Sequence, residues 1–164
     1  MRTLTLPQPY ASLLAVGAKG IETRSWAPSY RGPLAIHASS RHVHSGKSLL
    51  LARMARIAGS ISPEQEQEFR ARAVPFGAIV ATCELVDVVP TNEIVWSDDL
   101  DRPWRIIVSR SGADHVDWVM ASTSERAFGD FGEGRFAWLL DNVHTFADPV
   151  PAKGAGRLWH WEST

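Results

Sequence analysis

The stretch Gly17-Ala18-Lys19-Gly20-Ile21-Glu22-Thr23-Arg24-Ser25-Trp26 is the most informative segment of this 164-residue chain. It follows a short apolar segment, residues 10–14, and its first glycine is typical of the end of a helix. Beyond that glycine the side chains alternate, so Glu22, Arg24 and Trp26 are expected on one face of a strand. A helix closed by glycine and followed by a strand therefore brings charged groups and an indole together.

Lys19, at the entrance of this strand, admits two interpretations. If its amine lies beside Arg24, the second cation lowers the pKa of the amine, and Lys19 can act as a base or polarise an acyl oxygen. The alternative is a structural ion pair between Lys19 and Glu22, with Trp26 in the core. Spacing alone favours the ion pair.

Glu84 lies within residues 78–86, a run of apolar and β-branched residues that predicts a central strand. An unpaired carboxylate is expensive to bury, so we expect Glu84 to be paired or functional. A contact between Lys19 and Glu84 would form an acid–base couple, and a structural salt bridge is the alternative.

The remaining pattern predicts helices in the first half of the chain and strands in the second. Ser45 is expected to cap a second helix that ends at Gly59, and Ser62 with Gln65 forms a capping box for a third, polar helix. Strands are expected at residues 21–26, 34–38, 78–89, 104–109, 136–140 and 158–161. Residues 128–136 form a glycine-spaced aromatic loop, either a flexible lid or a compact turn filled by its own phenylalanines. The chain is therefore expected to be a single α+β domain over residues 1–164, or a small barrel with helical insertions.

Charge is distributed unevenly along the chain, although the net charge is only −1. Residues 1–56 contain eight Lys and Arg and one acid, whereas residues 57–164 contain nine bases and 17 acids. The near-neutral total excludes a generic polycation that coats nucleic acid by charge alone, but the first third is expected to meet an anion. Seven tryptophans supply both core residues and stacking platforms for a base.

Other residues limit the cellular context and the cofactors. The single cysteine, Cys83, forms no internal disulfide, and neither a membrane span nor a signal peptide is evident, so we expect a cytoplasmic protein with no membrane partner. His37, His42 and His44 lack an accompanying HExxH motif or cysteine pair, so neither a metal nor another cofactor is expected. Lys47 lies in the first turn of the second predicted helix, where it either contacts an anion or belongs to a solvated face.

Several short motifs occur in a characteristic order. They are Leu4-x-Leu6-x-Gln8-Pro9-Tyr10-Ala11-x-x-Leu14, Gly17-x-Lys19-x-x-Glu22-x-Arg24-Ser25-Trp26 and Tyr30-Arg31-Gly32-Pro33-Leu34-x-Ile36-His37-Ala38-Ser39. This combination resembles the ASCH domain family. The late motifs Gly134-Arg135-Phe136-Ala137-Trp138-Leu139-Leu140 and Gly156-x-Leu158-Trp159 are similar to its endothelial-overexpressed, lipopolysaccharide-associated-factor branch.

The resemblance implies a PUA-like small β-barrel flanked by two or three helices, with a cleft for RNA or a nucleoside. Some similar proteins hydrolyse N4-acetylcytidine with a lysine, a threonine and a glutamate, and ribonuclease activity also occurs in the family. Lys19 matches the lysine and Glu84 the glutamate, whereas Glu22 stands at the threonine position. Thr23 is adjacent, but it is expected on the opposite strand face.

Two functions follow as expectations. In the first, the protein binds single-stranded RNA or a modified nucleoside: Lys19, Arg24, Arg31 and Lys47 contact phosphate, Trp26 stacks, and Glu22 or Glu84 accepts hydrogen bonds from a base. Ser39 completes this candidate binding set. In the second, the protein is a hydrolase in which Lys19 is the base or oxyanion partner and Glu84 the proton shuttle, with Glu22 also a candidate catalytic residue. A protein-interaction adaptor is a third alternative, because family members occur in coactivator complexes.

Overall fold

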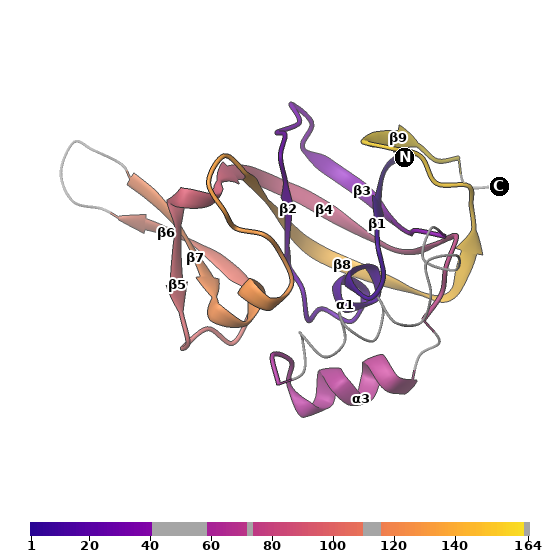
Figure 1. The fold of residues 1–164 in the computed structure, drawn as a ribbon, viewed down its shortest axis with the longest axis horizontal. Coiled ribbons are helices and arrows are strands. Elements are labelled where there is room, and N and C mark those ends of the chain that lie inside the picture. Colours follow the sequence, from indigo (N-terminus) through magenta and orange to yellow (C-terminus); the bar gives the residue numbers. More distant parts are fainter. Residues whose placement is uncertain (41–58, 72–73, 110–115, 163–164) are drawn as a thin grey trace.

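The computed structural model describes residues 1–40, 59–71, 74–109 and 116–162, and strands dominate it (Figure 1). The strands are β1 (Arg2–Leu6), β2 (Ile21–Arg24), β3 (Gly32–Ala38), β4 (Ala78–Pro90), β5 (Ile94–Ser97), β6 (Trp104–Ser109), β7 (Val116–Ser122), β8 (Phe136–Pro151) and β9 (Leu158–His160). The helices in this described part are α1 (Tyr10–Ala15), α3 (Pro63–Ala71) and two 3-10 helices, η2 (Thr91–Glu93) and η3 (Thr123–Ala127). The larger sheet has the order β2-β8-β4-β3-β1-β9, and the smaller has the order β5-β7-β6.

The helix, glycine and strand predicted for residues 10–26 are confirmed. α1 ends at Ala15, and Gly17 adopts a φ of +72°, a left-handed conformation that glycine reaches without steric cost. The Ala18 amide then donates to the Leu13 carbonyl (2.9 Å), which closes the helix end. β2 follows at once and pairs antiparallel with the beginning of β8.

The long strands β4 and β8 form the centre of the larger sheet. Register shifts interrupt their pairing at several points, and such β-bulges bend and twist a strand pair. The sheet covers a core of fully buried side chains that includes Leu4, Leu14, Ile36 and Trp138. Burying a side chain of this size contributes roughly 1.5–3 kcal/mol, so this core stabilises the curvature of the sheet.

The smaller sheet packs against the β2–β8 edge of the larger one through a second core cluster that includes Ile21, Trp104 and Leu139. The Trp104 indole N–H donates to the Leu140 carbonyl (3.0 Å). A Cβ at Gly20 would lie 2.6 Å from Pro103 Cβ, so only glycine allows this close approach. The two sheets therefore meet at the beginning of β2.

The capping box of the polar helix is confirmed at α3. The Ser62 amide donates to Gln65 Oε1 (3.0 Å), and the Gln65 amide donates back to the Ser62 hydroxyl (3.2 Å). The helix predicted from Ser45, with Lys47 in its first turn, lies outside the described residues.

The α+β class predicted from the sequence is confirmed by this arrangement. β1, β5 and β7 are additional to the predicted strands, and β8 extends well beyond residue 140. Within the described part of the chain, no helix is long and apolar enough to span a membrane.

Candidate functional site

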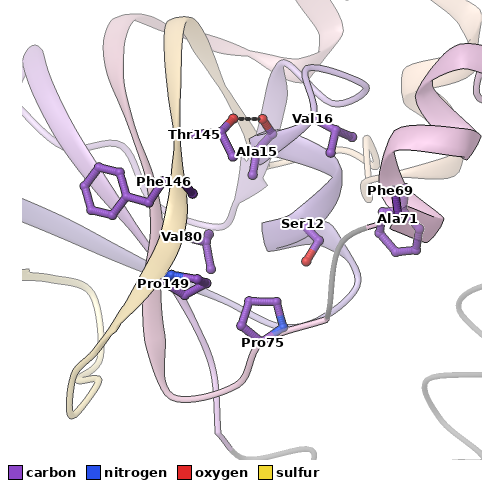
Figure 2. Close-up of a pocket in the computed structure, with 11 residues that line it drawn as sticks. Ser12, Ala15, Val16, Phe69, Ala71, Pro75, Val80, Thr145, Phe146 and Pro149 are labelled. Carbon is purple, nitrogen blue, oxygen red and sulfur yellow. Dashed lines mark hydrogen bonds between the residues drawn. The ribbon is translucent and has the colours of Figure 1, made fainter.

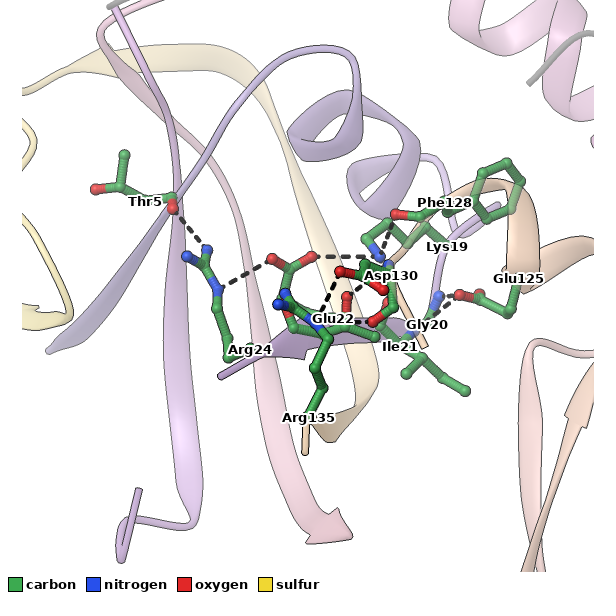
Figure 3. Close-up of polar contacts among 11 residues, drawn as sticks. Thr5, Lys19, Gly20, Ile21, Glu22, Arg24, Glu125, Phe128, Asp130 and Arg135 are labelled. Carbon is green, nitrogen blue, oxygen red and sulfur yellow. Dashed lines mark hydrogen bonds and ion pairs between the residues drawn. The ribbon is translucent and has the colours of Figure 1, made fainter. Parts of the chain in front are cut away.

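A network of charged side chains surrounds the beginning of β2 (Figure 3). Lys19 is fully buried, and its ammonium group donates to the carbonyls of Ile21 and Phe128, the latter at 3.2 Å. The same group lies 3.3 Å from Glu22 Oε2. The ion-pair interpretation of Lys19 and Glu22 is therefore confirmed, and the protons of the ammonium group are used within the fold.

Glu125, on η3, is a second buried carboxylate in this network, and the sequence analysis missed it. It accepts hydrogen bonds from the amides of Gly20 (2.6 Å) and Ile21 (3.3 Å). Burial raises the pKa of Glu125 to about 7, although the charge of Lys19 and the two amide bonds act in the opposite direction. The buried carboxyl group of Glu125 is therefore held by the backbone at the beginning of β2, within the electrostatic influence of Lys19.

Arg24 extends the network away from the smaller sheet. Its Nε lies 3.1 Å from Glu22 Oε1, and its Nη2 donates to the Thr5 carbonyl (3.0 Å). Glu22 therefore bridges Lys19 and Arg24, so that one carboxylate faces two cations. This excess of positive charge lies where Arg24 reaches an open pocket.

The pocket beside Arg24 has a volume of about 450 Å³. Its lining comes from β1, β2, β3 and the segment that precedes β9: Leu4, Thr5, Pro7, Arg24, His37, Ser39, Ser40, Gly154, Ala155, Gly156 and Arg157. Among these residues there are two guanidinium groups and no carboxylate. Such a lining favours an anionic or hydrogen-bonding ligand.

His37 forms part of the pocket wall and contributes no charge at neutral pH. Its Nε2 lies 3.0 Å from the Ala152 carbonyl, and its Nδ1 has no hydrogen-bond partner among the described residues. Burial lowers the pKa of His37, although the bond to Ala152 acts in the opposite direction. A Cβ at Gly154 would lie 2.3 Å from His37 Cε1, so the backbone of that segment packs directly on the imidazole.

Trp26 lies half-buried next to this pocket. Its ring meets Trp138 edge to face, with centroids 4.7 Å apart at 90°. The guanidinium of Arg157 lies 5.4 Å from the centre of the Trp26 ring, within the range of a cation–π contact. The predicted neighbours Arg24, Trp26 and Ser39 are thus brought to one region, and Arg157 joins them from far along the chain.

Glu84 is exposed rather than buried in the central strand, and Lys19 is not among its described contacts. Cys83 and Leu85 are buried, but Glu84 between them points to the solvent face of β4. Its carboxylate accepts a hydrogen bond from Asn142 Nδ2 (3.0 Å). The apolar run that predicted a central strand is covered on one face at this position, which explains the error.

The other candidate binding residues are separate from the pocket or undescribed. Arg31 forms an exposed ion pair with Asp87 (2.9 Å). Lys47, His42 and His44 lie outside the described residues. No group of three or more His, Cys, Asp or Glu side chains arranged to hold a metal ion occurs in the part of the chain that the structure describes.

A smaller cavity of about 260 Å³ lies between α1, α3 and β8 (Figure 2). Apolar side chains such as Phe69, Val80 and Phe146 dominate its lining, and Thr145 donates a hydrogen bond to the Ala15 carbonyl at its edge. No charged side chain is among the described residues that line it. It therefore offers little recognition chemistry compared with the pocket beside Arg24.

Comparison of the sequence with models of known protein families identifies the family of this chain. The family model of the ASCH domain matches residues 4–112, which include β1, the charged segment around β2 and the His37 wall of the pocket. No curated protein matches the chain. Because the family model covers most of the sequence, the chain belongs to the ASCH domain family.

Proposed function

We propose that this protein binds single-stranded RNA or a modified nucleoside in the pocket beside Arg24. The observation that carries the proposal is a cavity of about 450 Å³ whose described lining has two arginines and no carboxylate, next to the half-buried ring of Trp26. ASCH domains are generally RNA-binding domains, which agrees with this chemistry. A cavity of this volume suits a single nucleoside unit.

The proposal gives the side chains different roles. The guanidinium of Arg24 is held by Glu22 and the Thr5 carbonyl, so its orientation is fixed before a ligand arrives. Trp26 contributes aromatic surface next to the pocket, where Arg157 lies over its ring, and Ser39 supplies a hydroxyl in the pocket wall. Arg31 and Lys47 remain candidates for contacts with phosphates of a longer RNA.

The test compares Arg24→Gln with Arg70→Gln. Arg70 also forms an ion pair, with Glu66 (2.6 Å), but on the exposed surface of α3, so it is a matched control. Binding of a labelled single-stranded RNA and of N4-acetylcytidine is measured by anisotropy and calorimetry, with circular dichroism as the check of folding.

We expect Arg24→Gln to weaken binding at least about tenfold, and added salt to weaken RNA binding in both the wild type and Arg70→Gln. Wild-type protein that binds neither ligand, or a folded Arg24→Gln variant with wild-type affinity, contradicts the proposal.

Hydrolysis of the bound nucleoside or RNA is the second candidate function. The observation that favours it is Glu125, whose pKa of about 7 lies in the range of a general acid or base beside Lys19. Of the charged side chains around Lys19, Glu22 is the one that connects this buried pair to Arg24 and the pocket.

Chromatography of N4-acetylcytidine, with cytidine and acetate as products, tests this activity. We expect Glu22→Gln to lose product formation more strongly than ligand affinity. The absence of product with wild-type protein, for the nucleoside and for single-stranded RNA, rejects the hydrolase.

We infer further that the larger sheet belongs to a PUA-like barrel of the endothelial-overexpressed, lipopolysaccharide-associated-factor branch. Two sequence motifs near the end of the chain support the assignment to this branch. Residues 134–140 lead into the part of β8 that pairs with β2, and residues 156–159 lead into β9 beside β1.

A further inference from the structure

Arg157 differs from most described arginines because it has no carboxylate partner in the described part of the chain. Five others are ion-paired: Arg24, Arg31, Arg70, Arg102 and Arg135. The guanidinium of Arg157 instead lies over the ring of Trp26 at the pocket wall. A stacked guanidinium keeps its in-plane N–H groups available for an acceptor.

The backbone at Arg157 is held in an unusual conformation. Its φ is +54°, in the left-handed region that non-glycine residues rarely occupy. Such conformations persist where the surrounding structure imposes them, and they concentrate at ligand-binding sites. The position thus directs a long cationic side chain to a place that a relaxed backbone would not favour.

The segment before Arg157 is anchored on both sides of the pocket. Gly154 packs on the ring of His37, and the Thr5 hydroxyl donates to the Ala155 carbonyl (2.9 Å). The Trp159 indole N–H donates to the same hydroxyl (3.0 Å). These contacts fix the backbone on both sides of Arg157, so the direction of its side chain is set by the fold.

Charge around the pocket remains positive after all described ion pairs are counted. Glu22 is shared between Lys19 and Arg24, and Arg157 adds a further cation without adding an acid. The planar fork of Arg157 can donate paired hydrogen bonds to a phosphate. Arg24 adds a second positive charge at the same pocket, although its Nε and Nη2 are already bound by Glu22 and the Thr5 carbonyl. A neutral nucleoside would leave this charge without a counterion.

We propose that Arg157 and Arg24 form a phosphate subsite, so that the pocket prefers a nucleotide to the corresponding uncharged nucleoside. This inference rests on the proposed function, because it assumes that the nucleoside part binds in the same pocket. The phosphate comes either from a mononucleotide or from the backbone of RNA, and the two sources are separated in the test.

The test measures binding by calorimetry on the full chain. The ligands are adenosine, cytidine, guanosine and uridine, each paired with its 5′-monophosphate, together with inorganic phosphate and a tetranucleotide RNA with a free 5′-hydroxyl. The main variant is Arg157→Gly, because glycine accepts the left-handed φ and removes only the side chain. Arg157→Lys keeps the charge without the planar fork, and Lys153→Ala removes an exposed cation of the same segment that does not line the pocket.

We expect at least one monophosphate to bind wild-type protein at least about tenfold more tightly than its nucleoside. Arg157→Gly should remove this difference between monophosphate and nucleoside, Arg157→Lys should retain part of it, and Lys153→Ala should retain all of it. Competition by inorganic phosphate supports the subsite. Tighter binding of the tetranucleotide than of any monophosphate identifies a phosphodiester as the source, and the reverse identifies a terminal phosphate.

The outcomes separate the two proposals. Equal affinities for nucleoside and monophosphate in the wild type, or an unchanged ratio in folded Arg157→Gly, overturn the phosphate subsite and leave nucleoside binding intact. An equal loss in Lys153→Ala also overturns it, because general electrostatic attraction then explains the preference. Wild-type protein that binds no nucleoside, nucleotide or RNA overturns both the proposed function and the subsite.

Discussion

The two ends of β2 use charge in opposite ways, although Lys19 and Arg24 are only five positions apart in the same motif. At the beginning, Lys19 and Glu125 are buried and bound by partners from the fold: two carbonyls for the amine and two amides for the carboxyl. At the end, Arg24 reaches an open pocket beside Trp26. The difference between the two ends is burial: Lys19 and Glu125 are enclosed by the fold, whereas the guanidinium of Arg24 lines a pocket that a ligand can enter.

The free-energy cost of deleting a charged side chain also differs between the two ends of β2. Ions removed from water are costly, so a buried ion whose partner is deleted destabilises the fold by several kcal/mol. An ion at an open pocket keeps its hydration until a ligand displaces the water, and its deletion changes binding more than folding. Stability measurements therefore probe the beginning of β2, and binding measurements probe its end.

The largest expected effect is that of Lys19→Met. The substitution leaves Glu22 and Glu125 without the buried cation, so we expect a loss of about 3–5 kcal/mol in the free energy of unfolding. Urea denaturation followed by circular dichroism measures it, with Arg70→Gln as the surface ion-pair control. If the Lys19→Met variant unfolds at the same urea concentration as the wild type, the charges at the beginning of β2 do not stabilise the fold.

Glu125→Gln tests the same end through pH. The folded-state pKa of Glu125 is raised from 4.5 to about 7, so between these values the folded protein binds a proton that the unfolded chain does not. The contribution of Glu125 is therefore present below about pH 4.5 and is lost as the pH rises through 7. Glutamine does not ionise, so the Glu125→Gln variant lacks this dependence of stability on pH.

We expect the free energy of unfolding of the wild type, relative to Glu125→Gln, to fall by about 3 kcal/mol between pH 4.5 and 7.5. Urea denaturation of both proteins at several pH values measures this difference. Parallel pH profiles for the two proteins are incompatible with a raised pKa at Glu125.

Gly154→Ala tests the pocket end. The added Cβ would lie 2.3 Å from His37 Cε1, so the segment must move off the imidazole, at a cost of about 1–3 kcal/mol. Gly156→Ala is the matched control, because no atom lies within 4 Å of its Cβ position. The midpoint temperature of thermal unfolding should fall for Gly154→Ala and stay at the wild-type value for Gly156→Ala, and equal midpoints of the two variants contradict the described packing.

The smallest expected effect is that of Glu84→Gln. Its carboxylate is exposed and has one described hydrogen bond, so we expect a change in the free energy of unfolding below about 0.5 kcal/mol. Urea denaturation measures it beside Lys19→Met. A loss of several kcal/mol would mean that Glu84 belongs to the buried network after all.

Local patterns predicted the local parts of this fold. The glycine after α1 and the capping box of α3 depend on residues within one or two turns, and both are confirmed. β1 is different, because it becomes a strand by parallel pairing with β3, a partner about 30 residues away. A five-residue segment that ends at Leu6, just before Pro7, has no local signal strong enough to indicate that pairing.

Of the contacts in the site, only those between residues of one strand could be predicted from the sequence. Alternation correctly put Glu22 and Arg24 together, as their ion pair shows. Glu125 and Arg157 contact residues at the two ends of this segment, Gly20 and Trp26, from more than 100 positions away, and neither stands out from its sequence neighbours. The exposure of Glu84 likewise depends on which elements cover each face of the sheet, which strand periodicity does not specify.

Gly20 has a consequence for how freely this sequence can diverge. Its amide binds Glu125, its carbonyl accepts from the Leu140 amide (2.9 Å), and its α-carbon abuts Pro103. Three parts of the chain thus meet at one residue that has no side chain, and any Cβ at this position must push Pro103 and Trp104 away from β2. We therefore expect position 20 to tolerate a larger residue only together with a change at Pro103 or Trp104 that restores the space between the two sheets.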